Sequence, residues 1–189
     1  MFPFLLLYSE RMNNKLYFYE VNKQYTEYLA RFDKKVPLEH ENRGLRKFVG
    51  IVLDINGIKY YAPMSSPKPK HKNLSPTMPD LFKIKDGEYG VINLNNMIPV
   101  PDNCLTKVVI RNILDEKYKL LLSNQYREIN NHAQKIRRKA EKLYQFINSC
   151  KNDKLKERCC QFKYLEKKMV HFKLELKNYK QDYNKKVDV

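Results

Sequence analysis

The chain has 189 residues, of which 42% are hydrophobic, enough for one domain with its own core. Its formal net charge is +16 and its pI is near 9.6. Such a surplus of positive charge indicates polyanionic partners, either nucleic acid or an anionic membrane surface. The absence of a Gly-rich nucleotide loop and of any Cys-x-x-Cys pair argues against a nucleotide cofactor and a zinc finger. We predict that the four cysteines are neutral thiols in a reducing cytoplasm.

The first residues include an apolar run from Phe2 to Tyr8. This run is too short to cross a bilayer, which needs about 20 residues. It also lacks the basic segment and the cleavage site of a signal peptide. We therefore predict no membrane segment. Residues 1–11 are interpreted as a leader or a non-native extension, with an added edge strand as the alternative.

Runs of aromatic and β-branched residues predict a sheet core over residues 15–111. The first strand, Lys15–Val21, precedes a short helix that is capped by Asn22. The apolar face of this helix carries Tyr25, Tyr28, Leu29 and Phe32. Asn56-Gly57 predicts a hairpin between strands 48–55 and 58–64. Further strands at 80–85, 89–95 and 105–110 have short connections, which favour antiparallel pairing.

From Asp115 onward, apolar residues follow helical spacing up to Ile147, with loosening at Asn130-Asn131. After a turn, two rows of apolar residues repeat every seven residues, as in a packed helix seam. These rows are Leu155, Phe162, Met169 and Leu176, and Leu165, Phe172 and Tyr179. We expect an antiparallel helical hairpin over residues 115–180, with this stripe packed inside the chain and a dimer seam as the alternative.

The predicted fold class is therefore α+β, with residues 1–189 as a single domain. It consists of a compact, twisted antiparallel sheet of about six strands, a short N-terminal helix and a C-terminal helical hairpin.

The loop 63–79 carries the most informative group of side chains. A predicted strand ends at Met64 and presents Ser65 at the edge of the sheet. No carboxylate falls between Ser65 and Asn73, and four prolines stiffen residues 67–79. The candidate side chains of this loop are Ser65, Ser66, Lys68, Lys70, His71 and Lys72. A stiff, cationic, hydroxyl-bearing loop suits the binding of phosphate.

Further basic residues lie outside this loop and are candidates for contact with an RNA backbone. Before the loop these are Lys34, Lys35, Arg43, Arg46 and Lys47. A second run, on the predicted helix, is Lys135, Arg137, Arg138 and Lys139. This run is either a solvated helix face or an RNA contact.

These residues support one reaction that needs no metal and no cofactor, the cleavage of RNA by its own 2′-hydroxyl. The protein must orient the strand, transfer a proton and stabilise charge on the phosphoryl oxygens. We assign proton transfer or charge stabilisation to Lys68, whose pKa neighbouring cations would lower, and phosphate positioning to Ser65 and Ser66. His71 is a second candidate for the acid or base. The alternative is an ordinary Ser-Ser-Pro turn with solvated lysines.

Three stretches resemble the endoribonuclease toxins of type III toxin–antitoxin systems, the ToxN/AbiQ/TenpN family. They are Tyr25–Pro37, Phe48–Lys68 with His71 following, and Gly90–Pro99. The resemblance spans roughly residues 16–110. It implies a twisted antiparallel sheet with helices, metal-independent cleavage of RNA, and inhibition by a tandem-repeat RNA antitoxin that the toxin can cut from its precursor.

The same resemblance implies particular site residues. The hydroxyl pair of the family falls on Ser65 and Ser66, and its lysine after the proline falls on Lys68. A further family lysine falls on Arg46 or Lys47, with Arg46 in the better register. A tyrosine that some members carry in the preceding loop has no match here.

We therefore expect a cytoplasmic endoribonuclease toxin that acts on cellular or phage RNA and associates with its antitoxin RNA as a hetero-oligomer. A non-catalytic RNA-binding module that uses the same basic residues is the alternative. A partner-binding protein that uses the apolar helical stripe is a third.

Overall fold

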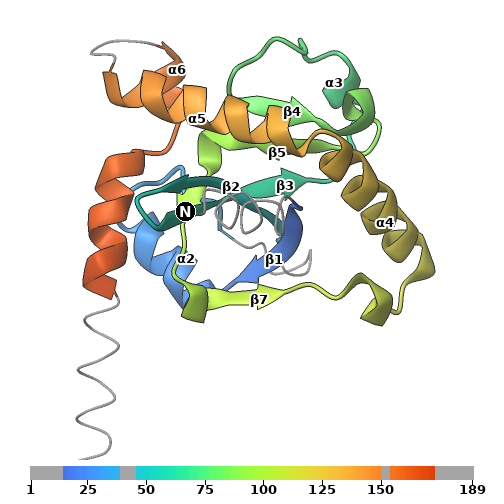
Figure 1. The fold of residues 1–189 in the computed structure, drawn as a ribbon, viewed down its shortest axis with the longest axis horizontal. Helices are drawn as coiled ribbons and strands as arrows, with labels where there is room; N and C mark the ends of the chain where they lie inside the picture. Colours follow the sequence, from blue (N-terminus) through green and yellow to red (C-terminus); the bar gives the residue numbers. More distant parts are fainter. Residues whose placement is uncertain (1–14, 39–45, 150–153, 173–189) are drawn as a thin grey trace, which may run out of the picture.

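The computed structural model describes residues 15–38, 46–149 and 154–172 (Figure 1). The chain begins with β1 (Tyr17–Val21) and α2 (Lys23–Ala30) and continues into the hairpin of β2 (Phe48–Ile55) and β3 (Ile58–Ser65). Four short strands follow, β4 (Leu81–Lys83), β5 (Val91–Asn93), β6 (Ile98–Pro99) and β7 (Leu105–Lys107). The helices α4 (Glu116–Asn131), α5 (Ala133–Ser149) and α6 (Lys154–Arg158) come last, before a further helical segment at residues 162–172.

The described strands form one antiparallel sheet in the order β4-β5-β3-β2-β1-β7, with β6 paired to β3. This sheet confirms the predicted antiparallel architecture, and β6 adds a strand to the six expected. Asn56 and Gly57 form the predicted hairpin turn with φ values of 52° and 83°, the conformation that Asn-Gly favours. We predicted that Ser65 lies at the edge of the sheet. Because β3 lies between β2 and β5, Ser65 instead ends an interior strand, and the chain leaves the sheet there.

Helix α2 forms where the sequence predicts it. The side chain of Asn22 accepts a hydrogen bond from the backbone N–H of Tyr25, which satisfies one of the first donors of the helix. Tyr25 and Leu29 are fully buried, and the Tyr25 hydroxyl donates to the carbonyl oxygen of Pro99 at 2.6 Å. This hydrogen bond joins α2 to β6, so the tyrosine belongs to the core.

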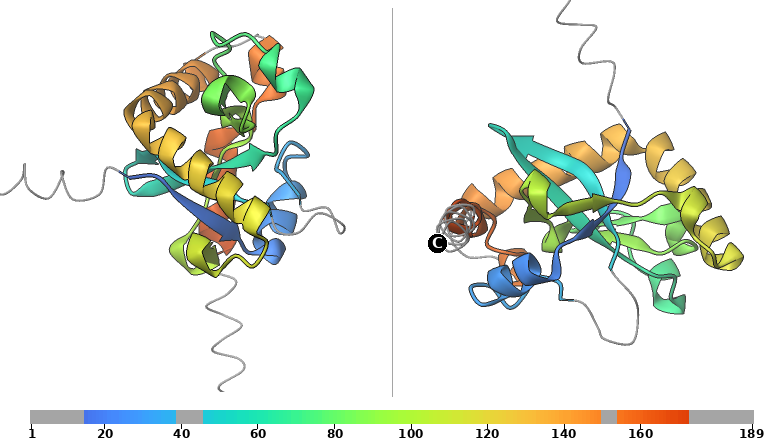
Figure 2. Two further views of the ribbon diagram at one scale, coloured as in Figure 1. Left: turned by 90° about the vertical axis from the view of Figure 1, so that its right-hand side faces the viewer. Right: turned by 90° about the horizontal axis from the view of Figure 1, so that it is seen from below.

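The C-terminal helices differ from the expected two-helix hairpin. A break at His132 separates α4 from α5, close to the loosening predicted at Asn130-Asn131. A second break at residues 159–161 interrupts the apolar stripe. Helix α5 crosses the molecule, and residues 162–172 run down its side, so the two do not lie antiparallel (Figure 1). Figure 2 shows α5 on one side of the sheet and α2 on the other.

The stripe nevertheless packs inside the chain, as predicted. Phe162, Leu165 and Met169 are buried in the main core, and Leu155 and Phe172 pack against it. Leu176 and Tyr179 lie outside the described residues.

One polar network ties the helical segment at 162–172 to the sheet. The Glu166 carboxylate accepts hydrogen bonds from the hydroxyls of Tyr60 and Tyr144, both at 2.7 Å. Burial, followed by the hydrogen bond to Glu166, raises the pKa of both tyrosines, so their hydroxyls remain donors. This network holds the last helical segment against β3 and α5.

We expect Tyr60→Phe to lower the free energy of unfolding by about 1–3 kcal/mol, because Glu166 loses one of two charge-assisted hydrogen bonds. Urea denaturation measures this change. Tyr164→Phe, which removes the hydroxyl of a ring that is 39% exposed, is the control. Equal losses in the two variants would contradict a specific role for the Tyr60 hydroxyl.

Candidate active site

The segment after β3 is held more firmly than a proline-rich loop. Pro69–Lys72 form the short helix α3, with proline at the first turn, where its missing N–H has no helical partner to lose. The Lys83 ammonium donates to the carbonyl oxygens of Lys72 and Leu74 at 2.8 and 3.0 Å. The polar side chains of Ser66, Lys68, Lys70 and Lys72 are exposed along this segment, as are Pro67, Pro69 and Asn73.

Two glycines in the connection between β4 and β5 lie directly beneath this segment. Gly90 has φ +97°, and a Cβ there would lie 2.2 Å from the carbonyl oxygen of Ser65. Gly87 has φ +91°, and a Cβ there would lie 2.6 Å from the carbonyl oxygen of His71. Only glycine permits both the backbone conformation and this close approach. Sequence reasoning did not identify these two positions as part of the site.

Ser65 opens into a polar cavity of about 390 Å³ that collects residues from distant parts of the chain. The lining residues are Lys34, Lys35, Val36, Pro37, Leu38, Arg46, Pro63, Ser65, Asn93 and Asn96. The fold therefore brings four of the predicted site residues together, the hydroxyl of Ser65 and the cations Lys34, Lys35 and Arg46. Ser66 and Lys68 follow Ser65 in the chain and are exposed, but they are not among the residues that line this cavity.

Hydrogen bonds orient the Arg46 side chain and hold the backbone of Lys35 in place. The Arg46 guanidinium donates through Nη2 to the carbonyl oxygen of Leu38 at 3.3 Å. The Asn96 side chain donates to the carbonyl oxygen of Lys35 at 2.8 Å, which holds the residues after α2 against the sheet. Asn93 and Asn96 were not predicted as site residues, although both lie in the stretch Gly90–Pro99 that carries the family resemblance.

His71 lies in the interior, although we considered it as an acid or base. Its side chain is only 3% exposed, and its Nδ1 is buried without a hydrogen-bond partner among the described residues. Burial, and then the positive charges of Lys68 and Lys70, lower the pKa of His71. The imidazole is therefore neutral near pH 7, and this position argues against direct contact with a substrate.

Two further basic residues, Lys47 and Arg43, were predicted to contact RNA. Lys47 forms a partly buried ion pair with Glu20 on β1, which offsets its charge. This placement favours Arg46 over Lys47 as the cation before β2. Arg43 lies outside the described residues.

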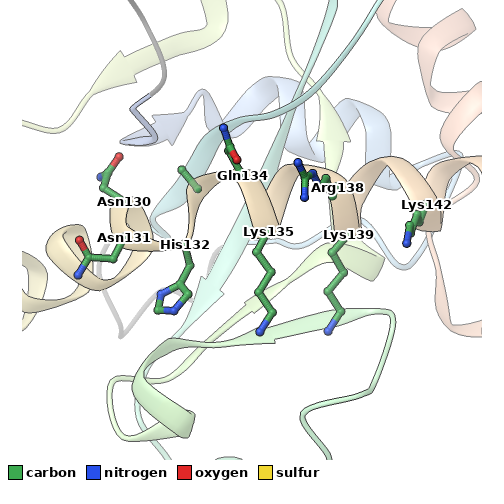
Figure 3. Close-up of a pocket in the computed structure, with 9 residues that line it drawn as sticks. Asn130, Asn131, His132, Gln134, Lys135, Arg138, Lys139 and Lys142 are labelled. Atoms are coloured by element: carbon green, nitrogen blue, oxygen red, sulfur yellow. The ribbon is translucent and has the colours of Figure 1, made fainter. Parts of the chain in front are cut away.

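The predicted basic run on α5 does not reach Ser65 but lines a second cavity of about 720 Å³ (Figure 3). Lys135, Arg138 and Lys139 line this cavity, joined by Lys142 and polar residues around the α4–α5 junction. Figure 3 shows the side chains of Lys135 and Lys139 extending side by side. Burial, and then the charge of Lys135, lower the pKa of Lys139.

Arg137, the fourth residue of the predicted basic run, does not line this cavity. Its Nε donates to the carbonyl oxygen of Ile51 on β2 at 3.2 Å, and burial lowers its pKa. Because helical side chains one residue apart point in different directions, Arg137 packs on the sheet while its neighbours line the cavity. Its predicted role in RNA binding is not supported.

The described residues also bear on metal sites, membrane-spanning helices and reactive cysteines. In the described ranges, no three His, Cys, Asp or Glu side chains group closely enough to hold a metal ion, and no helix is long and apolar enough to cross a membrane. Cys104, Cys159 and Cys160 are buried, and burial raises the pKa of Cys160. Cys150 lies outside the described residues.

The antiparallel sheet and the hydroxyl-bearing cationic cavity together define a small α+β protein suited to a polyanionic ligand. The chain belongs to the ToxN toxin family of type III toxin–antitoxin systems, whose family model matches residues 17–170.

Individual relatives support this assignment. Endoribonuclease ToxN of Pectobacterium atrosepticum is 33% identical over 162 residues, which covers 82% of this chain and 92% of the relative. A solved structure of AbiQ, described as "a lactococcal anti-phage endoribonuclease belonging to the type-III toxin-antitoxin system", is 28% identical with a TM-score of 0.75. That likeness covers 84% of this chain and 98% of the AbiQ chain.

A further solved structure is described by "selective toxin inhibition by a non-coding RNA pseudoknot". It is 28% identical with a TM-score of 0.73, and the likeness covers 84% of this chain and 98% of that chain. These structural likenesses confirm the predicted fold class, and the family match confirms the resemblance seen in the sequence.

The burial of His71 leads to a pH prediction. Because its pKa is lower in the folded than in the unfolded protein, its contribution to stability is full above about pH 6.5 and is lost as pH falls below that value. We expect His71→Phe, which removes the titrating group, to lose less thermal stability than the parent protein between pH 7.5 and 5.5. Thermal unfolding at each pH measures this difference.

The control is His171→Gln, which alters an exposed histidine on the last helical segment. This variant should follow the parent protein across the pH range. A parallel decline in the parent protein and His71→Phe would contradict the inferred effect of burial.

Proposed function

We propose that this chain is an endoribonuclease toxin that cleaves RNA without a metal ion. The observation that carries the proposal is the shared cavity of Ser65, Arg46, Lys34 and Lys35, one hydroxyl among three cations. Its membership of the ToxN family, two relatives of which are named endoribonucleases, supports RNA as the substrate.

In the proposed reaction, the ribose 2′-oxygen attacks the adjacent phosphorus as the P–O5′ bond breaks. The products are a 2′,3′-cyclic phosphate and a 5′-hydroxyl. The 2′-hydroxyl proton leaves to a base, and the 5′-oxygen receives a proton, so the step needs neither water nor a cofactor. The protein supplies orientation, proton transfer and charge stabilisation.

Each side chain has a role that its position permits. Ser65 and Ser66 position the phosphate, and Arg46 stabilises negative charge as a permanent cation. Lys68, an exposed lysine three residues after Ser65, transfers a proton or stabilises the phosphoryl oxygens. Lys34 and Lys35 hold the backbone of the RNA at the cavity, and Lys70 and Lys72 extend this surface along α3.

The proposed partner is a tandem-repeat RNA antitoxin, whose precursor the toxin cuts and with which it forms a hetero-oligomer in the cytoplasm. The structure of a relative in which a non-coding RNA pseudoknot inhibits the toxin supports this partner. The second cavity, lined by Lys135, Arg138 and Lys139, supports RNA contact away from Ser65. Cellular or phage RNA is the proposed substrate, and an anti-phage role follows the description of AbiQ.

We expect Ser65→Ala and Lys68→Ala each to reduce kcat by roughly 100- to 1,000-fold, because each removes a group that stabilises the transition state. The assay incubates purified protein with RNA and analyses the end groups of the products. Lys117→Ala is the matched control, because it removes the same charge from an exposed position on α4, outside the proposed site. Full activity in both site variants would contradict the assignment of residues.

The same assay tests the reaction class. Cleavage should persist in EDTA and yield cyclic phosphate ends. Strong inhibition by the chelator would indicate a metal mechanism. Intact RNA that nonetheless binds the protein would favour the alternative, a non-catalytic RNA-binding module.

The second cavity leads to a binding prediction. Changing Lys135, Arg138 and Lys139 together to Ala should reduce the dependence of log Kd on log salt by about 2, if each cation contacts one phosphate of a single strand. Arg137 is kept, because its hydrogen bond to Ile51 supports the fold.

The matched control changes the exposed Lys154, Lys163 and Lys167 to Ala, which removes the same charge from other helical segments. Titration of a 2′-deoxy RNA analogue at several salt concentrations measures both slopes. Equal slopes in the two triple variants would identify the α5 run as a solvated face.

A further inference from the structure

Asn93 makes the most specific contact to the proposed catalytic hydroxyl. It is the last residue of β5 and lines the same cavity as Ser65 and Arg46. Its side-chain amide nitrogen donates to the hydroxyl oxygen of Ser65 at 2.9 Å and to the carbonyl oxygen of Pro63 at 3.3 Å. One amide group thus contacts β3 on either side of Met64.

The register of the sheet explains why the amide lies there. Met64 pairs with Ile92 and Ser65 with Val91, so the next pair would place Pro63 opposite Asn93. Proline has no N–H to offer the ladder, and the chain leaves β5 after Asn93 to begin a short 3₁₀ turn. The Asn93 side chain therefore supplies the donor that satisfies the Pro63 carbonyl.

The Pro63 contact also determines the polarity of the contact to Ser65. A backbone carbonyl oxygen can only accept, so the group facing it must be the NH₂ of Asn93 and not its oxygen. The second hydrogen of the same NH₂ is directed at the Ser65 hydroxyl oxygen, which must accept it. An accepting hydroxyl keeps its own hydrogen for another partner.

We infer that Asn93 is a positioning residue that sets the Ser65 hydroxyl as a hydrogen-bond donor toward a phosphate oxygen of the substrate. This inference rests on the proposed function and deepens it, since it specifies what Ser65 does. A hydroxyl held in this way is oriented before the substrate arrives, so no reorganisation is needed as charge develops. The inference also means that Ser65 is not the general base, because Ser65 donates a hydrogen bond to the phosphate while the base must accept the 2′-hydroxyl proton.

The sharpest test is Asn93→Asp, which preserves shape but reverses polarity. A carboxylate cannot donate, so the Ser65 hydroxyl would turn its hydrogen toward the new carboxylate and away from the phosphate. We expect kcat to fall by roughly 100-fold for Asn93→Asp and by roughly 10-fold for Asn93→Ala, in which Ser65 is free to rotate. For Asn93→Ala, the Kd of a 2′-deoxy RNA analogue should stay unchanged, since the phosphate contact strengthens only in the transition state.

A pH profile tests whether the lost activity depends on the missing hydrogen-bond donor. The new carboxyl group regains a donor when it is protonated, near pH 4 for an ordinary aspartic acid. The ratio of the Asn93→Asp rate to the parent rate should therefore rise as pH falls from 7 to 5. A constant ratio would overturn the inference, because it would show that the loss of activity does not depend on whether the new side chain can donate.

A double-mutant cycle tests whether Asn93 acts through Ser65. In a Ser65→Ala background, Asn93→Ala should cause little further loss of kcat. A full further loss in that background would overturn the inference, and so would full activity of Asn93→Ala and Asn93→Asp in an otherwise unchanged protein. Should Ser65→Ala itself cleave at the parent rate, the proposed site fails, which is a separate result.

The parent protein provides a test that does not depend on the folding of an Asn93 variant. Sulfur is a weaker hydrogen-bond acceptor than oxygen, so a donating Ser65 should make cleavage slower for one of the two phosphorothioate diastereomers at the scissile phosphate. Ser65→Ala should abolish this preference. A preference that is unchanged in Ser65→Ala would show that the hydroxyl does not donate to that oxygen.

Discussion

The close approach of Gly90 to the backbone of Ser65 is the constraint on which the candidate site depends. At the end of β3 the chain must turn out of the sheet while a neighbouring strand begins on the same side. A glycine at φ +97° lets the two backbones come together there, where any Cβ would collide with the Ser65 carbonyl oxygen. Gly87 does the same for α3, and Lys83 holds the end of that helix. The exposed cationic segment is therefore attached to the sheet at several points.

Features that depend on neighbours in the sequence were predictable. The Asn56-Gly57 hairpin, the Asn22 cap and the periodicity of α2 all formed as expected, because each depends on local conformational preference. The second break in the C-terminal helices was harder to predict. The apolar rows continue in the sequence across residues 159–161, although the chain changes direction there. Helix α3 was also missed, since a proline that opens a helix looks the same in sequence as one that stiffens a loop.

Several residues of the candidate site could be predicted from their type, but the contacts that these residues make could not. Ser65 and Arg46 were chosen from composition and resemblance, and the fold places them in one cavity. Asn93 could not be chosen in that way, because an asparagine at the end of a strand is ordinary until its register against Pro63 is known. The partners of the basic residues were likewise not visible in the sequence. Lys47 and Arg137 were predicted to bind RNA, whereas the structure gives Lys47 an ion pair with Glu20 and Arg137 a hydrogen bond to the Ile51 carbonyl oxygen.

The positions of the candidate groups also narrow the choice of proton carrier in the proposed reaction. His71 is the buried residue of α3 and is neutral near pH 7, so it does not face the RNA. Arg46 keeps its proton at any physiological pH, which suits charge stabilisation but not proton transfer. Ser65 is oriented by Asn93 to donate a hydrogen bond. Among the side chains that we assigned to the chemistry, this leaves Lys68, an exposed lysine three residues after Ser65, as the proposed proton carrier.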